Sequence, residues 1–463
     1  MRVLALSCGA VLSGCGSGPA TLNNGLATLD FRHTVAKAKD KVFPAVVFIL
    51  CLSESHESGA KITQEVSGSG VIISPGGEVL TNWHVVDKAA EIRCLLYDGR
   101  AMPAEVIGTD KDTDLALLQL KPAGTTTASP PATQPVGALP YAELGDSSKL
   151  KEGDFVMAMG APWGLSRSVT IGIVSCARRY LPDQSEYSLW LQTDASISPG
   201  NSGGPLLNTD GLVVGVTTLG VMYGGDMGFA VPSNTIAVIL PQLREHKRVN
   251  WSWTGLQLQP LRDFNRNIDF GETEGVIVAE TDPESPARRA GVQPRDRIVR
   301  VNGKSVTGLW GEDLPPIRRE LGLLTKHQPA QFEIVRTGQT LTLEITPREK
   351  GKVEGEELDC PRWDLTVKTI NQFDNPDLHF YRQKGVFVFG VKYPGNAASS
   401  GLQAKDIILK VEGKDVATLA EVKAVHKEAL AKLATKHRLI FTVLRNGLTR
   451  QIVLDFARDY QKE

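Results

Sequence analysis

The sequence lacks an excess of either charge. Its 463 residues include 51 Lys and Arg against 52 Asp and Glu, so the net charge is close to zero. A balanced chain has no global field that would attract nucleic acid or an anionic membrane. Beyond its first residues it also lacks any run of about eighteen apolar residues, the length that a membrane-spanning helix needs. We therefore expect no nucleic-acid partner and an exported, soluble body.

Cysteine is scarce, and its spacing carries no metal motif. Two of the six cysteines, Cys8 and Cys15, fall within residues 1–15. The other four are Cys51, Cys94, Cys176 and Cys360. None of their spacings matches a metal site. Cys51 and Cys94 lie in strand-like runs and could form a disulfide in an oxidising compartment, but we prefer four buried thiols.

The N-terminus carries an export signal. Residues 1–15 read MRVLALSCGAVLSGC, with one arginine, a short apolar run and then Cys15. This resembles a bacterial lipoprotein signal peptide, in which cleavage before the cysteine leaves that residue lipidated. An ordinary signal peptide or a misassigned start is the alternative. Either kind of signal peptide predicts a periplasmic or cell-envelope protein. The first also predicts a lipid anchor at Cys15, followed by a tether and N-terminal segment over residues 16–40.

Glycine and proline are plentiful, at 45 and 26 residues, which indicates many turns. The length suggests about two to four domains. From Val42 to about Val231, short β-branched runs alternate with Gly, Pro and Asp, a pattern typical of a β-barrel or β-sandwich. A Pro/Thr/Ala-rich stretch at residues 122–140 divides these runs into two groups. We therefore predict one mainly β domain over residues 41–246.

The C-terminal half contains an internal repeat. Sliding the sequence against itself by 110 residues aligns Gly275 with Gly385 and Gly291 with Gly401 without a gap. Asp296 falls on Asp406 and Gly303 on Gly413 in the same way. Two copies of one module are predicted, over residues 250–348 and 359–458. A charged linker at residues 348–358 separates them.

Gly200-Asn201-Ser202-Gly203-Gly204-Pro205 carries the strongest chemical signal. A nucleophilic serine needs small neighbours, because they let the backbone turn tightly and aim successive N–H groups at one point. The N–H groups of Gly200 and Ser202 would then form an oxyanion hole. A glycine-rich β-turn is the alternative for this hexapeptide taken alone.

Serine is a poor nucleophile unless a histidine takes its proton and a carboxylate orients that histidine. Of the eight histidines, His84 in TNWHVV directly follows an apolar run, whereas the others lie in polar contexts. Asp114 in DTDLAL immediately precedes a strand-like run. A lone Asp there would be read as a turn or cap, but the order His, Asp, Ser with strands between them favours a triad.

These motifs together resemble the HtrA/DegP family of serine proteases. The matching segments, in the family's order, are SGSGVIIS, TNWHVV, DKDTDLALLQL, LQTDASISPGNSGGPLLN and GFAVPS, followed by two PDZ-like copies. The resemblance implies a mainly β fold, with a chymotrypsin-like double β-barrel and two α+β PDZ domains. It makes His84 the general base, Asp114 its orienter and Ser202 the nucleophile, with Gly200 and Asn201 shaping the oxyanion loop. No metal or cofactor is required.

PDZ domains bind an extended peptide C-terminus as an added strand and hold its carboxylate on backbone N–H groups. In the first copy the resemblance assigns that loop to Trp253, Thr254, Gly255 and Leu256. In the second copy we align it with residues 363–366, where Asp364 replaces glycine. An acidic side chain would repel a carboxylate, so peptide binding and a purely structural role remain equally open for that copy.

The resemblance further implies ATP-independent degradation of misfolded exported proteins by a homotrimer. A chaperone or scaffold without turnover is the second hypothesis, and a sensor protease making one regulatory cut is the third. The stretch Ala195 to Asn201 contains no acidic residue to pair with Lys or Arg, so we expect a small or medium aliphatic side chain before the cleaved bond.

Overall fold

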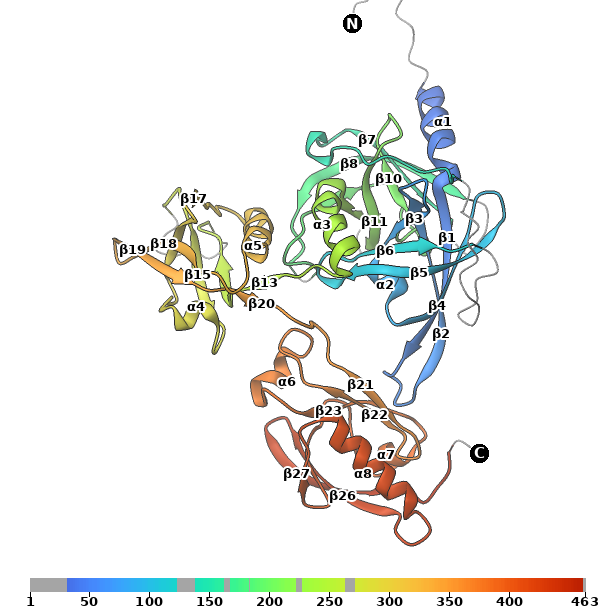
Figure 1. The fold of residues 1–463 in the computed structure, drawn as a ribbon, viewed down its shortest axis with the longest axis vertical. Helices are drawn as coiled ribbons and strands as arrows, with labels where there is room; N and C mark the ends of the chain where they lie inside the picture. Colours follow the sequence, from blue (N-terminus) through green and yellow to red (C-terminus); the bar gives the residue numbers. More distant parts are fainter. Residues whose placement is uncertain are drawn as a thin grey trace, which may run out of the picture.

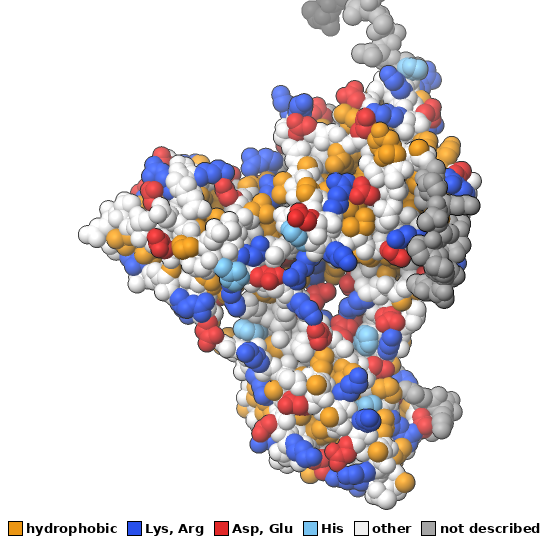
Figure 2. All heavy atoms as spheres, viewed as in Figure 1, with side chains coloured by type: hydrophobic (Ala, Val, Ile, Leu, Met, Phe, Trp, Pro, Cys, Tyr) orange, Lys and Arg blue, Asp and Glu red, His pale blue; other side chains and the backbone are white. Residues whose placement is uncertain are grey.

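The computed structural model describes residues 31–122, 138–161, 167–182, 184–221, 227–262 and 271–460, except for the side chains of residues 219–221. The predicted signal peptide, Cys15 and most of the Pro/Thr/Ala-rich stretch lie outside these residues. The described chain forms a double barrel followed by two smaller β-rich modules (Figure 1). Charges of both signs are interspersed on the face seen in Figure 2, as the balanced composition predicts. No described helix is long and apolar enough to cross a membrane.

The first barrel is preceded by helix α1 (Phe31–Val42) and the 3₁₀ turn η1 (Phe43–Ala45). Its strands are β1 (Val46–Ser55), β2 (Ile62–Ile72), β3 (Glu78–Thr81), β4 (Ala89–Leu95), β5 (Ala101–Asp110) and β6 (Leu115–Leu120). They close in the order β1-β2-β3-β6-β5-β4. Helix α2 (Trp83–Val86) follows β3, and the 3₁₀ turn η2 (Lys111–Thr113) joins β5 to β6.

The second barrel closes in the order β10-β11-β12-β9-β8-β7. Its strands are β7 (Phe155–Gly160), β8 (Ser168–Arg179), β9 (Trp190–Thr193), β10 (Pro205–Leu207), β11 (Val213–Val221) and β12 (Met227–Pro232). The 3₁₀ turn η3 (Ser147–Lys149) precedes it, and helix α3 (Ser233–His246) follows. The expected mainly β, double-barrel fold is confirmed.

One apolar core joins the two barrels. Strand β6 reads LALLQL, and all of its residues except Gln119 are buried. Leu115 and Leu117 belong to the same buried cluster as Val216 and Val231 of the second barrel. Burial of such continuous apolar strands is the main favourable term in folding. It fixes the two barrels against each other, and the strand ends at their junction are held rigidly.

The two modules share one strand order. In the first it is β14 (Leu256–Gln259), β15 (Val276–Thr281), β16 (Arg297–Val301), β18 (Ala330–Arg336) and β19 (Gln339–Ile345). In the second it is β22 (Leu365–Thr369), β23 (Val386–Val391), β24 (Ile407–Val411), β26 (Arg438–Arg445) and β27 (Leu448–Asp455). The small strands β17 (Lys304–Ser305) and β25 (Lys414–Asp415) pair with β16 and β24. The sequence repeat is therefore a repeat of topology.

Two helices of each module correspond at the 110-residue offset. Helix α4 (Pro286–Arg289) matches α7 (Asn396–Ser399), and α5 (Leu314–Gly322), which follows the 3₁₀ turn η5 (Gly311–Asp313), matches α8 (Leu419–Ala431). The second module also has α6 (Pro376–Tyr381), and most of the equivalent positions in the first module lie outside the described residues. Strand β13 (Ser252–Trp253) pairs with β20 (Arg348–Glu349), so the chain entering the first module lies beside the chain leaving it.

The main sheet of the second module has one described strand more than that of the first. Strand β21 (Glu357–Cys360) pairs antiparallel with β22, the counterpart of β14. Cys360 is fully buried in one cluster with Val422 of α8, and the His426 ring nitrogen Nε2 lies 2.7 Å from the Pro361 carbonyl oxygen. Strand β21 thus begins within the stretch that we expected to be linker, and its end packs against α8.

The hydrogen bonds confirm that Asp364 stands where the first module has Gly255, and they correct the placement of Trp363. Ala287 N–H donates to the carbonyl of Thr254, and Ala397 N–H donates to that of Trp363. Trp363 therefore takes the place of Thr254 rather than of Trp253. Gly255 and Asp364 are equivalent, with φ of 74° and 57°. The strand pairing gives the same shift along β14 and β22, because Leu256 pairs with Thr281 and Leu365 pairs with Val391. The second module therefore has one residue more between its first two common strands.

Asp364 is not an open loop carboxylate. Its Oδ2 accepts the backbone N–H of Asn396 at 3.0 Å, and Asp364 is 3% exposed. In the first module Ser285 performs this capping, because its Oγ accepts the N–H of Arg288. A Cβ on Gly255 would lie 2.2 Å from the Ser285 Cβ, and a Cβ on Gly395 would lie 2.8 Å from the Asp364 Cβ. Each module thus places one glycine beside one capping side chain. In the first module the loop position is the glycine and the position before the helix is the cap, and in the second module this is reversed.

The tip of the β1–β2 hairpin contacts the second module (Figure 1). Thr366 Oγ1 donates to the His56 carbonyl at 2.5 Å, and His56 Nδ1 lies 3.0 Å from a Glu357 carboxylate oxygen. A Cβ on Gly59, which has φ of 82°, would lie 2.1 Å from the backbone nitrogen of Lys392. The hairpin and β23 therefore approach each other closely, backbone against backbone.

The four described cysteines are free, so the disulfide alternative for Cys51 and Cys94 is not formed. Cys51, Cys94 and Cys360 are buried as expected, whereas Cys176 is only half-buried. Burial raises the pKa of the Cys51 thiol to about 12. Buried thiols of this kind are unreactive and pack as small apolar side chains.

Candidate active site

His84 and Asp114 lie side by side at the junction of the barrels. His84 is on the short helix α2, and its Nδ1 lies 2.9 Å from Asp114 Oδ2 and 3.0 Å from Oδ1. The His84 backbone N–H donates to Asp114 Oδ1 at 3.1 Å. When Nδ1 carries the proton and donates it to the carboxylate, the lone pair of Nε2 is free to accept another. This geometry supplies an oriented base.

The position of Asp114 is fixed by its backbone and by a threonine. Asp114 ends the η2 turn with φ of 54°, a left-handed conformation that costs energy for a residue with a Cβ. Its N–H donates to the Lys111 carbonyl, and its own carbonyl accepts from Asn82 Nδ2 at 3.0 Å. Thr218 Oγ1 of β11 donates a short hydrogen bond to Oδ2. The carboxylate is thus held by both barrels.

Ser202 stands in a turn that admits only glycine at two positions. A Cβ on Gly203 would lie 2.1 Å from the Ser69 carbonyl oxygen, and one on Gly204 would lie 2.0 Å from that of Met159. Ser202 Oγ donates its hydrogen to the Thr218 carbonyl at 2.9 Å. Since a hydroxyl has one hydrogen, it is not donated to His84 in this arrangement. Catalytic hydrogen bonds commonly form only when substrate is bound.

The loop before Ser202 is tied to the first barrel by Ser69. Ser69 Oγ donates to the Gly200 carbonyl at 2.6 Å and accepts the Ala161 N–H at 2.8 Å. Gly200 has φ of 95°. The Asn201 N–H donates to the Ser198 carbonyl at 2.9 Å, so Asn201 shapes the loop and offers no N–H of its own to a ligand. The N–H groups of Gly200 and Ser202 remain as candidate oxyanion donors.

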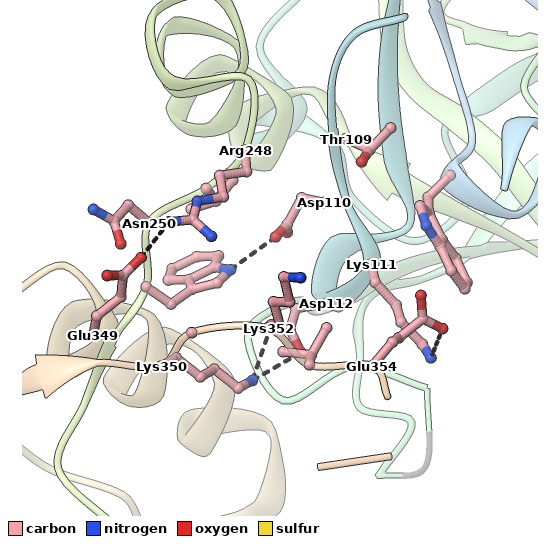
Figure 3. Close-up of a pocket in the computed structure, with 15 residues that line it drawn as sticks. Thr109, Asp110, Lys111, Asp112, Arg248, Asn250, Glu349, Lys350, Lys352 and Glu354 are labelled. Atoms are coloured by element: carbon pink, nitrogen blue, oxygen red, sulfur yellow. Dashed lines mark hydrogen bonds and ion pairs between the residues drawn. The ribbon is translucent and has the colours of Figure 1, made fainter. Parts of the chain in front are cut away.

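Two linkers cross the turn that carries Asp114 (Figure 3). Lys350 Nζ, from the linker between the modules, lies 2.9 Å from each Asp112 carboxylate oxygen. Trp251, from the linker before the first module, donates its Nε1–H to Asp110 Oδ1 at 2.9 Å. The two linkers also bond to each other, because Lys350 N–H donates to the Trp251 carbonyl at 2.8 Å. The modules are therefore connected to the turn beside Asp114.

Asp110 is a buried carboxylate at the start of that turn. Its Oδ2 accepts both the N–H and the Oγ1–H of Thr113, at 3.0 and 2.6 Å. Burial, together with the nearby Asp112 charge, raises the pKa of Asp110 to about 7, and the hydrogen bonds from Thr113 and Trp251 oppose this rise. Asp110 thus stabilises the turn while it bears a costly buried charge.

The first module has a groove along β14. The sequence-predicted loop residues are all there: Trp253 and Thr254 are buried, Gly255 turns the chain, and Leu256 begins the strand. They line a cavity of about 660 Å³ together with Leu258 and α5. Among the described residues β14 pairs only with β15, so its other edge is open.

The structure brings His84 and Asp114 together and places Ser202 beside Thr218, which touches both Asp114 and Ser202. Sequence reasoning missed Thr218 because nothing in its local pattern separates it from other strand threonines. It missed Ser69 as well, although the small-residue run SGSG at residues 67–70 was a signal of close backbone approach.

Comparisons with known proteins agree with this geometry. A trypsin-like peptidase domain family matches residues 68–216, and a PDZ domain family matches residues 277–320 within the first module. The chain is 33% identical over 401 residues to a DegP-like periplasmic serine endoprotease of Hahella chejuensis, covering 84% of this chain and 80% of the relative. A DegP-like relative from Marinomonas is 34% identical over 381 residues, covering 81% and 76%.

Solved structures give the same relationship. The HtrA-type protease AlgW with a tripeptide superposes with a TM-score of 0.58 at 29% identity, covering 68% of this chain and 97% of that one. A serine endoprotease from Yersinia pestis has a TM-score of 0.51 at 29% identity, with the same coverage.

Proposed function

Because this chain belongs to the HtrA/DegP family of serine endoproteases, we propose that His84, Asp114 and Ser202 are its catalytic triad. The observation that carries the assignment is the short contact of His84 Nδ1 with both oxygens of Asp114. It is supported by the constrained turn around Ser202. His84 and Asp114 lie on separate elements of the first barrel. Ser202 lies on the second barrel, as a site between two barrels requires.

In this mechanism Ser202 Oγ turns from Thr218 toward His84 and attacks the carbonyl carbon of a peptide bond. His84 Nε2 accepts the hydroxyl proton and then gives it to the leaving amine. Asp114 keeps Nδ1 protonated and stabilises the imidazolium. The N–H groups of Gly200 and Ser202 bind the oxyanion, and water then releases the acyl group from Ser202. An aliphatic side chain is proposed before the cleaved bond.

The test is casein degradation by the purified chain compared with Ser202→Ala. Loss of cleavage in the variant supports the triad. If neither protein cleaves and both suppress aggregation of an unfolded client, the chaperone or scaffold hypothesis is favoured. If Ser202→Ala cleaves as fast as the parent chain, the nucleophile lies elsewhere and the assignment is wrong.

We further propose that the first module binds peptide C-termini. The open edge of β14 can accept an added strand, and the left-handed turn at Gly255 supports a loop whose N–H groups would bind a carboxylate. The relatives AlgW were solved with a tripeptide and with a decapeptide. The substrates we propose are misfolded exported proteins, whose free ends and apolar segments are accessible.

The second module is proposed to be a PDZ domain with a structural role. Its strand order supports the PDZ assignment, and β21 lies on the edge that a peptide would need. The contact of β22 with the β1–β2 hairpin supports a role in holding the protease domain. The domain boundaries 41–246, 250–348 and 359–458 are proposed from the strand order.

We propose periplasmic export because the relatives are named periplasmic endoproteases. A homotrimer and a lipid anchor at Cys15 are proposed from the resemblances seen in the sequence.

A further inference from the structure

The groove of the first module is closed on one side by the second module. The near wall consists of β14 and α5, which contribute Leu256, Leu258 and Leu321. The opposite wall comes from the segment around α6, namely Phe373, Pro376, His379 and Phe380. The cavity of about 660 Å³ thus lies between the two modules rather than on one of them.

Aromatic and charged contacts hold α6 at this position. The rings of Trp253 and Phe373 meet edge to face, with centroids 6.4 Å apart. The Arg348 guanidinium lies 4.2 Å from the centre of the Trp253 ring, and Lys350 Nζ lies 5.1 Å from that of Phe373. Asn371 Nδ2 donates to the linker carbonyl of Lys352 at 2.8 Å. The linker and the loop entering α6 therefore form one packed unit.

Phe380 is the residue of this wall that indicates a bound ligand. Its side chain is 85% exposed although it lines a cavity, whereas most phenylalanines are buried. Exposed aromatic side chains at the rim of a groove are the type of residue that anchors peptide ligands. The neighbouring Tyr381 is 50% exposed and meets the Phe380 ring edge to face, with centroids 5.5 Å apart, although it does not line the cavity.

The pleat of an added strand determines how a ligand would use both walls. Successive side chains of a strand point to opposite sides. A peptide paired with β14 would therefore direct one set of alternate side chains toward Leu258 and α5. The other set would point away from the first module, where Phe380 and His379 lie.

We propose that Phe380 of the second module is a specificity-determining residue for the peptide bound by the first module, and that it selects ligands with a large apolar side chain at alternate positions. The occupant is the extended C-terminus of an unfolded exported protein. This inference rests on the proposed peptide binding by the first module. The second module would thus contribute to recognition of the peptide bound by the first module, although β21 occupies the edge of its own strand β22.

The test measures binding of fluorescein-labelled decapeptides to the full chain carrying Ser202→Ala, which prevents cleavage. All peptides end in valine, and a single phenylalanine is moved through the six positions before it in an otherwise Ser/Ala sequence. Fluorescence anisotropy gives Kd for the parent and for Phe380→Ala. We expect Phe380→Ala to weaken binding by about tenfold for phenylalanine at alternate positions and not at the positions between them.

The matched control is Leu448→Ala. Leu448 is an apolar residue of the same module that is 63% exposed and does not line the cavity, so its removal should leave every Kd unchanged. If the parent and Phe380→Ala bind every peptide with equal affinity, the role of Phe380 is overturned, while the proposed peptide binding by the first module still stands. If no peptide binds the parent, or if C-terminal amides bind as well as free carboxylates, the proposed C-terminus binding by the first module fails, and the inference fails with it.

Discussion

Lys350 Nζ lies 2.9 Å from both carboxylate oxygens of Asp112, two residues before Asp114. Lys350 belongs to the linker between the modules, and its side chain is only 5% exposed. A buried ion pair of this kind is costly to break, because the remaining charge loses its partner. The contact therefore makes the backbone turn that presents the triad carboxylate depend on a residue more than two hundred positions away in the chain.

Lys350→Met should lower kcat for a peptide substrate by about tenfold while KM changes little, because a small displacement of Asp114 misaligns His84. Lys350→Arg should retain most of the activity. Lys352→Met is the control, since Lys352 lies in the same linker but pairs with Glu356 at the surface. Steady-state kinetics well below the melting temperature provide the measurement. A loss that merely follows the unfolded fraction, or none at all, would show that Lys350 does not position the site.

Asp114→Asn should lower kcat by about three to four orders of magnitude, because an amide cannot hold His84 in the tautomer that frees Nε2. The fold should survive, since Thr218 can still donate to the amide oxygen. Circular dichroism checks the fold and substrate turnover checks the effect. Activity within tenfold of the parent would mean that another group orients His84.

Asp110 predicts a pH dependence of stability. Its pKa of about 7 in the folded chain exceeds the ordinary value of 3.8, so the folded state keeps a proton that the unfolded state releases. The free energy of unfolding should therefore fall as pH rises from about 4 to about 7, by up to about 1.4 kcal/mol per pH unit, and then level off.

Urea unfolding of the parent and of Asp110→Asn between pH 4 and 8 measures this contribution. The variant should be less stable overall, because its amide oxygen can accept both hydrogen bonds from Thr113 but its NH2 group cannot accept the Nε1–H of Trp251. Its stability should vary less with pH. Parallel curves for the two proteins would contradict the assignment.

The first module pairs Gly255 with the cap Ser285, and the second pairs the cap Asp364 with Gly395. This equivalence can be tested by giving the second module the residues of the first. Asp364→Gly removes the acceptor for the Asn396 N–H and should cost about 1 to 2 kcal/mol of stability. Gly395→Ser alone should also destabilise, since its Cβ would approach that of Asp364 to 2.8 Å. The double variant recreates the arrangement of Gly255 and Ser285, so it should be more stable than the sum of the single changes predicts. Strict additivity in thermal unfolding would refute the equivalence.

The sequence predicted those features that depend on local pattern. Short β-branched runs indicated the barrels, and the glycines around Ser202 and the contexts of His84 and Asp114 singled out the candidate triad. The exact repeat indicated two modules of one topology. Each of these signals lies within a few residues, or in a comparison of the chain with itself.

What the sequence did not predict depends on contacts between distant segments. The charged stretch at residues 348–358 gave no sign that its ends form β20 and β21, because such short strands are stabilised by the edges they meet. The equivalence of Trp363 with Thr254 rather than with Trp253 became visible only through backbone hydrogen bonds. The position of Lys350 over Asp112 likewise depends on how the protease domain and the two modules pack together. No local sequence pattern encodes that packing.

The most direct test of the central claim is covalent labelling of the purified chain with a fluorophosphonate, followed by peptide mass spectrometry. This reagent modifies a serine whose hydroxyl is activated by a neighbouring base. Our account predicts a single adduct on Ser202 that is lost in Ser202→Ala and nearly lost in His84→Ala. An adduct on another serine, or labelling of Ser202 that persists at the parent rate without His84, would contradict the triad.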